Sequence, residues 1–171
     1  LNAPARRGVD PQQVEDRLRA DTKGEIKAVL VVQIDTSSGV WNDVEAIGKA
    51  IRAAGSDALF MVDGMASVGC VEFEMDKWGV DVTTCGSQKG LMTPPALGFV
   101  WANDRALARG EALSRGRAYW NWGPRADPEM FYQRFCGTAP VQHLYALRAA
   151  LDMIAAEGLD AIWARHTALA D

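Results

Sequence analysis

The sequence predicts an α/β fold built on a sheet of parallel strands. Short apolar runs rich in β-branched residues lie at 26–34, 58–62 and 80–84, and a helix-like segment separates the first two. Polar residues and a glycine follow each run, as is typical where a parallel strand ends at the edge of a sheet. The chain has 171 residues, of which 49% are apolar, so one domain with a sizeable core is expected.

Capping residues and apolar residues at helical spacing predict where the first helices lie. One helix begins at Asp10, whose side chain caps it, with Pro11 at its first position. The next is capped by Asn42 or Asp43, ends at 54–55, and completes a strand–helix–strand unit whose two strands end at the same edge of the sheet. The side chains expected to face the core from these two helices are Val14, Leu18, Val44, Ile47 and Ile51.

Beyond residue 90 the pattern predicts one more strand and three more helices. The strand covers 97–101, and Asn103 or Asp104 caps the short helix that follows. A longer helix begins at 141 and is ended by Gly158, and a last helix covers 159–169. The residues of the longer helix that recur at helical spacing and are expected to face the core are Val141, Leu144, Tyr145, Ala149 and Leu151.

Composition and charge argue against several kinds of function. The formal net charge is −4 and no basic stripe is present, so neither nucleic acid nor an anionic membrane is an expected partner. No apolar run approaches the length needed to span a membrane. Cys70, Cys85 and Cys136, together with His143 and His166, lack the spacing of a metal site, so no metal is expected. Three scattered cysteines fit reduced thiols and a cytoplasmic protein.

Two polar residues at successive strand ends indicate a cofactor site. Asp63 follows the apolar run 58–62, and Lys89 lies in the polar turn after the run 80–84. A partly desolvated lysine amine becomes a nucleophile toward carbonyl compounds, although most loop lysines are simply solvated. An electron-sink cofactor with a pyridine ring needs such an amine, and also a carboxylate that keeps the ring nitrogen protonated. Asp63 and Lys89 would supply that pair if both side chains converge on one ring.

The residues around this pair resemble class V aminotransferases, which depend on pyridoxal 5′-phosphate, and most closely their alanine–glyoxylate and serine–glyoxylate branch. Segments 62–69, 75–81 and 86–92 carry the resemblance, which extends from about Val29 to the C-terminus. It implies the large domain of a fold-type I pyridoxal-phosphate-dependent transferase, with a mixed, mostly parallel sheet and helices on both faces, present as a fragment. Residues 1–157 would be the C-terminal part of this cofactor-binding domain, and 158–171 the start of a small C-terminal domain.

The resemblance also implies roles for single residues. Lys89 would hold the cofactor as a Schiff base, and Asp63 would pair with the ring nitrogen. Thr138 would reach the phosphate of the neighbouring subunit's cofactor, which implies a homodimer with a shared site. Many relatives carry a tyrosine three residues earlier, where this chain has Phe135, which cannot donate a hydrogen bond. Further contacts, to the phenolic oxygen, the ring face and the phosphate respectively, are implied for Thr36, Met65 and Gln88.

The activity implied is the transfer of an amino group from a small amino acid (serine, alanine or aspartate) to glyoxylate or a similar 2-oxo acid. The family's phosphate loop, ring-stacking aromatic residue and substrate-binding arginine lie outside the chain, so the fragment alone is expected to be inactive. The stretch 114–124, rich in arginine and aromatic residues, would lie near the active-site entrance and the dimer contact rather than stack on nucleic acid.

Other interpretations remain open at this point. The chain could belong to another class V enzyme, such as a desulfurase or a lyase, or be a non-catalytic truncated fragment. A desulfurase would need a mobile nucleophilic cysteine, whereas Cys70, Cys85 and Cys136 all lie in strand-like or packed contexts by sequence.

Overall fold

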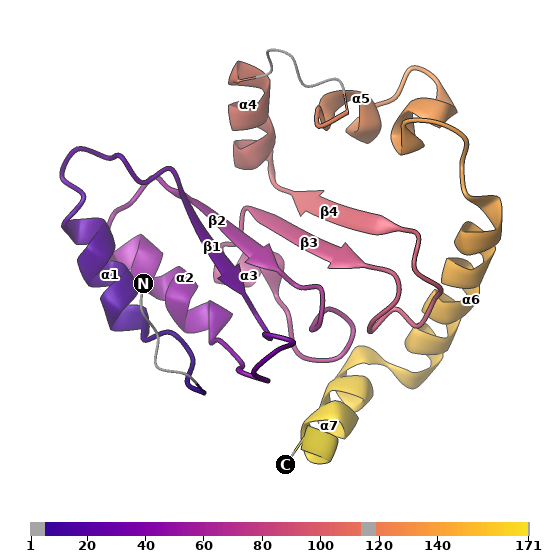
Figure 1. Ribbon diagram of the computed structural model, residues 1–171, viewed down its shortest axis with the longest axis horizontal. Coiled ribbons are helices and arrows are strands. Elements are labelled where there is room, and N and C mark those ends of the chain that lie inside the picture. Colours follow the sequence, from indigo (N-terminus) through magenta and orange to yellow (C-terminus); the bar gives the residue numbers. More distant parts are fainter. Residues whose placement is uncertain (1–5, 114–118, 171) are drawn as a thin grey trace.

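The computed structural model describes residues 6–113 and 119–170 and contains one four-stranded sheet (Figure 1). The strands lie in the spatial order β1 (Ala28–Val32), β2 (Leu59–Asp63), β3 (Val82–Gly86) and β4 (Gly98–Ala102). β1, β2 and β3 run parallel to one another, and β4 runs antiparallel to β3. The predicted mixed, mostly parallel sheet is therefore confirmed. Of the stretch 114–124, predicted to lie near the active-site entrance, residues 114–118 are outside the described residues, and so is Asp171.

The helices begin where the capping residues predict. Asp10 accepts a hydrogen bond of 2.9 Å from the Gln12 N–H, and Asp43 and Asn103 accept equivalent bonds from Ala46 and Ala106. Each cap satisfies a backbone N–H group that the first helical turn leaves unpaired. The helices are α1 (Pro11–Arg19), α2 (Val44–Ala53), α3 (Met75–Trp78), α4 (Asp104–Ala112), α5 (Gly123–Ala126), the 3₁₀ helix η1 (Phe131–Phe135), α6 (Val141–Glu157) and α7 (Leu159–Ala170).

The two faces of the sheet differ in how they are covered. One face carries Phe60 and Val62, which are buried beneath α1, α2 and α3. On the same face Cys85 packs against Ile154 of α6 and Ile162 of α7. The opposite face is more open, because Leu30 and Val100 are 73% and 47% exposed there. At the amino ends of the strands, α4 flanks this open face and helps to line a groove over it.

The apolar residues of α6 do not face the core in the way the sequence predicts. Val141, Tyr145 and Leu151 are 47%, 72% and 44% exposed, and the buried residues of this helix are Ala150 and Ile154. The prediction was wrong because α6 is apolar around most of its circumference, so that its spacing does not single out one face. The helix contacts the sheet through Leu147 and Ile154.

A buried carboxylate holds β2 and β3 together at their amino ends. Asp81 is 3% exposed. Its Oδ2 accepts a 2.7 Å hydrogen bond from the Phe60 N–H and forms a 2.5 Å ion pair with Arg105. Its Oδ1 accepts from the Asn103 side chain at 2.8 Å. Arg105 also donates to the backbone oxygens of Asp57 and Ala58. The carboxylate of Asp81, just before β3, therefore links β2 to the start of α4.

Asp81→Asn is expected to lower the free energy of unfolding by about 2 kcal/mol, because the amide would turn an N–H toward groups that are themselves donors. Urea unfolding followed by circular dichroism measures the loss. The matched control is Asp152→Asn on α6, which breaks an exposed i,i+4 pair with Arg148 and should cost less than about 0.5 kcal/mol. Equal losses for the two variants would contradict the role given to Asp81.

Candidate active site

Asp63 is the last residue of β2, and its carboxylate lies on the open face of the sheet. It is exposed, and its Oδ1 accepts a 2.8 Å hydrogen bond from the Met65 N–H. In the parallel register Asp63 lies between Val32 of β1 and Thr84 of β3. The carboxylate therefore stands where a parallel sheet presents its ligand-binding edge.

The loop that follows β2 and the loop that follows β3 are in direct backbone contact. The Gly64 N–H donates to the Thr84 carbonyl at 2.9 Å. Further along, a Cβ atom on Gly90 would come within 2.3 Å of the Val68 carbonyl oxygen, and one on Gly69 within 3.0 Å of the Gly90 carbonyl carbon. Because the atoms that would be hit belong to the backbone, the two loops can approach this closely only if positions 69 and 90 are both glycine.

Lys89 and Gln88 lie in the second of these loops. Lys89 is exposed, and its carbonyl accepts from the Met92 N–H at 2.9 Å. The turn is fixed from below by Ser87, which is fully buried and whose hydroxyl donates to the Pro94 carbonyl at 2.8 Å. Thr93 completes the turn by donating to the Ser87 carbonyl at 2.9 Å. The turn that carries Lys89 is thus held by hydrogen bonds from the side chains of Ser87 and Thr93.

Met65 and Gln88 meet above Gly86. A Cβ atom built on Gly86 would lie 2.6 Å from the Met65 Sδ and 2.7 Å from the Gln88 Oε1. The first of these side chains comes from the Asp63 loop and the second from the Lys89 loop. Two contacting loops therefore carry four of the six residues that the sequence analysis proposed: Asp63, Met65, Gln88 and Lys89.

Thr36 lies in the loop after β1, the third strand end at this edge of the sheet. It is exposed, and the loop is closed by the Asp35 N–H, which donates to the Val40 carbonyl at 2.9 Å. The hydroxyl and N–H of Ser38 lower the pKa of Asp35 below its ordinary value. The Gln33 N–H donates to the Asp63 carbonyl at 3.0 Å and ties this loop to the end of β2.

Thr138 is not brought to these loops by the described part of the chain. It is exposed and precedes α6, and Figure 1 shows this segment beyond β4, on the far side of the sheet from β1. A role toward a neighbouring subunit's cofactor stays a prediction.

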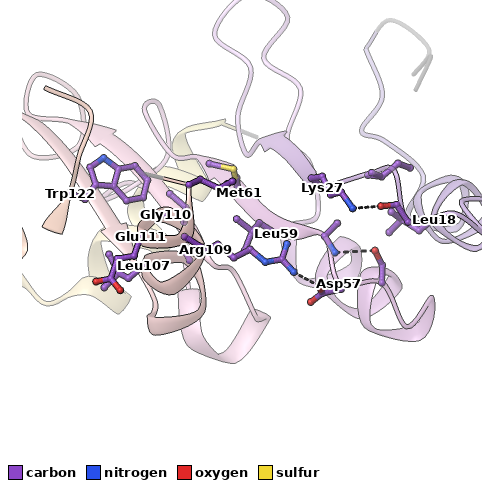
Figure 2. Close-up of a pocket in the computed structure, with 18 of the residues that line it drawn as sticks. Leu18, Lys27, Asp57, Leu59, Met61, Leu107, Arg109, Gly110, Glu111 and Trp122 are labelled. Carbon is purple, nitrogen blue, oxygen red and sulfur yellow. Dashed lines mark hydrogen bonds and ion pairs between the residues drawn. The ribbon is translucent and has the colours of Figure 1, made fainter. Parts of the chain in front are cut away.

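A groove over the open face of the sheet lies away from all six residues. It has a volume of about 1120 Å³ and is lined by the amino ends of β1 and β2 and by α4, with Trp122 at one end (Figure 2). Two of the cations that line it have partners: Arg109 contacts Asp57, and Lys27 donates to the Gly24 carbonyl. The candidate site is therefore an exposed edge of the sheet, not an enclosed pocket of this chain.

The three cysteines differ in environment. Burial raises the pKa of the Cys70 and Cys85 thiols, so neither is prepared to act as a thiolate nucleophile. The expectation that all three are packed was wrong for Cys136, which is exposed and contacts the Arg125 guanidinium at 2.7 Å. Cys136 follows η1, and its sequence context of mixed polar and aromatic residues gave no sign of this exposure.

Comparison with known proteins defines the class of protein first. The fold is that of solved aminotransferases: pyridoxamine-pyruvate aminotransferase from Mesorhizobium loti superposes with a TM-score of 0.84 at 31% identity, over 97% of this chain and 42% of that one. The sequence then gives the family. Residues 2–171 match the family model described as aminotransferase class-V, and the chain belongs to this family. The resemblance on which the sequence analysis relied is thereby confirmed.

Two curated relatives show how much of such a protein this chain represents. It is 40% identical to the serine–glyoxylate aminotransferase of Methylorubrum extorquens over 171 residues, which is 96% of this chain and 42% of the relative. It is 37% identical to the L-aspartate–glyoxylate aminotransferase of Paracoccus denitrificans over 172 residues, or 99% of this chain and 43% of the relative. The chain thus spans less than half the length of these relatives.

Gly90→Ala should separate the two loops, because the new methyl group would collide with the Val68 carbonyl and lie 2.9 Å from the Cys70 Sγ. We expect a loss of about 2 kcal/mol in the free energy of unfolding. Gly98→Ala is the control, since a Cβ atom there meets nothing within 4 Å and should change stability by less than about 0.5 kcal/mol. Urea titration compares the two, and a Gly90→Ala variant as stable as Gly98→Ala would refute the contact.

Proposed function

We propose that the protein containing this chain is a pyridoxal-phosphate-dependent aminotransferase with Lys89 and Asp63 as its catalytic residues. The observation that carries the proposal is the backbone contact between the loops after β2 and β3, which places an exposed carboxylate and an exposed amine at neighbouring strand ends. The family membership supports the same conclusion.

The residues present fit pyridoxal phosphate. An acidic group for the ring nitrogen, an amine for the aldehyde and a thioether beside them come from two contacting loops. Gly86 leaves the space next to Met65 and Gln88 that any larger residue would fill. Lys89 would hold the cofactor, Asp63 its ring nitrogen, Met65 the ring face, Thr36 the phenolic oxygen and Gln88 the phosphate. Thr138 would contact the phosphate of a second subunit's cofactor in a homodimer.

The work of the chain's own residues follows from their chemistry. Lys89 would hold the cofactor through its side-chain amine, which can bond to an aldehyde. With its amine free, Lys89 would take the proton from the substrate α-carbon and later return it, as a general acid and base. The Asp63 carboxylate would stabilise a protonated ring nitrogen. Bound pyridoxal phosphate supplies the electron sink for this proton transfer.

We propose a small amino acid (serine, alanine or aspartate) as the donor, and glyoxylate or a similar 2-oxo acid as the acceptor. The names of the relatives support this: they include serine–glyoxylate and L-aspartate–glyoxylate aminotransferases. Three free cysteines support a cytoplasmic location, in reducing surroundings. Within the described residues, no helix is both long and apolar enough to cross a membrane. The domain boundary at residue 158 is likewise a proposal.

For a desulfurase, the raised thiol pKa disfavours Cys70 and Cys85 as the nucleophile and leaves the exposed Cys136 as the remaining candidate. The non-catalytic interpretation predicts that the whole protein takes up no cofactor. The visible absorbance of the whole protein with pyridoxal phosphate therefore distinguishes a non-catalytic protein, which would show no band, from any enzyme of this fold that binds the cofactor through a lysine.

Lys89→Ala should abolish the visible absorbance band of lysine-bound cofactor in the whole protein, and with it all transamination, because the variant lacks the amine proposed to hold the cofactor. The control is Lys77→Ala on α3, an exposed lysine away from the strand ends, which should leave the band intact. A band that survives in Lys89→Ala would refute the assignment of the lysine. A band missing from the unmodified protein would refute the enzyme.

Asp63→Asn should keep the covalent bond but lower kcat about 100-fold, because an amide no longer stabilises a protonated ring nitrogen. The assay measures glycine formed from glyoxylate with serine, alanine and aspartate as alternative donors. Asp35→Asn is the matched control on the neighbouring strand-end loop and should leave kcat within about threefold. No glycine from any donor with the unmodified protein would overturn the proposed acceptor, and equal rates for the two variants would overturn the role of Asp63.

A further inference from the structure

Asp63 has one polar neighbour in the plane of the sheet. Its partner on β1 is Val32, and its partner on β3 is Thr84, which in turn faces Val100 of β4. Side chains of in-register residues in neighbouring strands point to the same face, about 4.8 Å apart. The exposure of all four residues agrees with this, since Val62 and Thr83, one position earlier, are buried on the opposite face. Thr84 is thus the neighbour of Asp63 on the same face of the sheet, one strand away.

Only one of the two carboxylate oxygens of Asp63, Oδ1, accepts a hydrogen bond from the described residues. Among the described residues, the hydrogen bond that it accepts is the 2.8 Å bond from the Met65 N–H to Oδ1. One such bond leaves the carboxylate free to rotate about it. Each carboxylate oxygen can accept two hydrogen bonds, so Oδ2 has room for a hydroxyl donor as well as for a ring N–H. Thr84 is the nearest hydroxyl in the register.

We propose that Thr84 is a positioning residue: its hydroxyl donates to Oδ2 of Asp63 and fixes the carboxylate in the orientation that the pyridine N–H of the cofactor needs. This inference rests on the proposed function, because it assigns Asp63 to the ring nitrogen. It adds a residue that the sequence analysis passed over. The hydrogen bond also favours the charged form of the carboxylate, which is the form that keeps the ring protonated.

The same strand provides a matched control. Thr83 is 1% exposed, and its Oγ1 has no hydrogen-bond partner among the described atoms. Thr83→Val and Thr84→Val make the same chemical change at adjacent positions on opposite faces of β3. Removing an unpaired buried hydroxyl is close to neutral, whereas removing a donor to a charged group weakens what that group does.

The test is the affinity of the whole apoprotein for pyridoxal phosphate, measured by fluorescence titration, in the unmodified protein and in Thr84→Val, Thr84→Ser and Thr83→Val. We expect about a tenfold weaker Kd for Thr84→Val, since a hydrogen bond to a charged group is involved. Thr84→Ser keeps the hydroxyl and should restore the Kd to within about threefold. Thr83→Val should bind as the unmodified protein does. Urea unfolding of each apoprotein checks that the fold is intact.

Each result decides the inference. Unchanged affinity in Thr84→Val overturns it, and so does a Thr84→Ser variant as weak as Thr84→Val, because then the hydroxyl is not what matters. An equal loss in Thr83→Val would assign the effect to the strand rather than to the donor. If the unmodified protein takes up no pyridoxal phosphate, the proposed function itself has failed. If all variants take up the cofactor with the same affinity, the proposed function is unaffected and only the positioning role of Thr84 is rejected.

Discussion

The backbone contact between Gly69 and Gly90 is the constraint on which the rest of the site depends. A parallel sheet brings the ends of β2 and β3 to the same edge, but this alone leaves two separate loops about one strand spacing apart. The close approach of the loops converts that proximity into a fixed relation, because neither loop can move without displacing the backbone of the other. The two residues proposed as catalytic, Asp63 and Lys89, belong to the two loops that this contact joins.

The opposite ends of the same strands are held by a different interaction. Asp81 precedes β3 and bonds the backbone of Phe60 in β2, so it fixes how the two strands are aligned. Alignment matters because a slip of one residue would turn every side chain of β3 to the other face. Thr83 would then replace Thr84 beside Asp63. The buried charge at the amino ends and the reactive groups at the carboxyl ends are therefore coupled through strands that are only five residues long.

The sequence predicted the strands, the helix caps and four of the residues that come together, for reasons that are local. Apolar runs, capping side chains and the residues that follow a strand act over a few positions, and Asp10, Asp43 and Asn103 cap their helices as expected. What it could not predict depends on distant partners. The register that sets Thr84 beside Asp63 is one such property. The face that α6 buries is another, because Tyr145 and Ile154 are both apolar and only the neighbouring sheet distinguishes them.

The exposure of the site has a physical explanation in how the sheet is covered. Helices α1, α2, α3, α6 and α7 pack on the face that carries Phe60 and Cys85, whereas the face that carries Asp63 has exposed Leu30, Val32 and Val100. A catalytic amine gains reactivity from desolvation, and a carboxylate strengthens its hold on a ring N–H when water is excluded. Neither condition is met by Asp63 and Lys89 as they stand, both being exposed. The described residues therefore fix the positions of this carboxylate and this amine without excluding water from either of them.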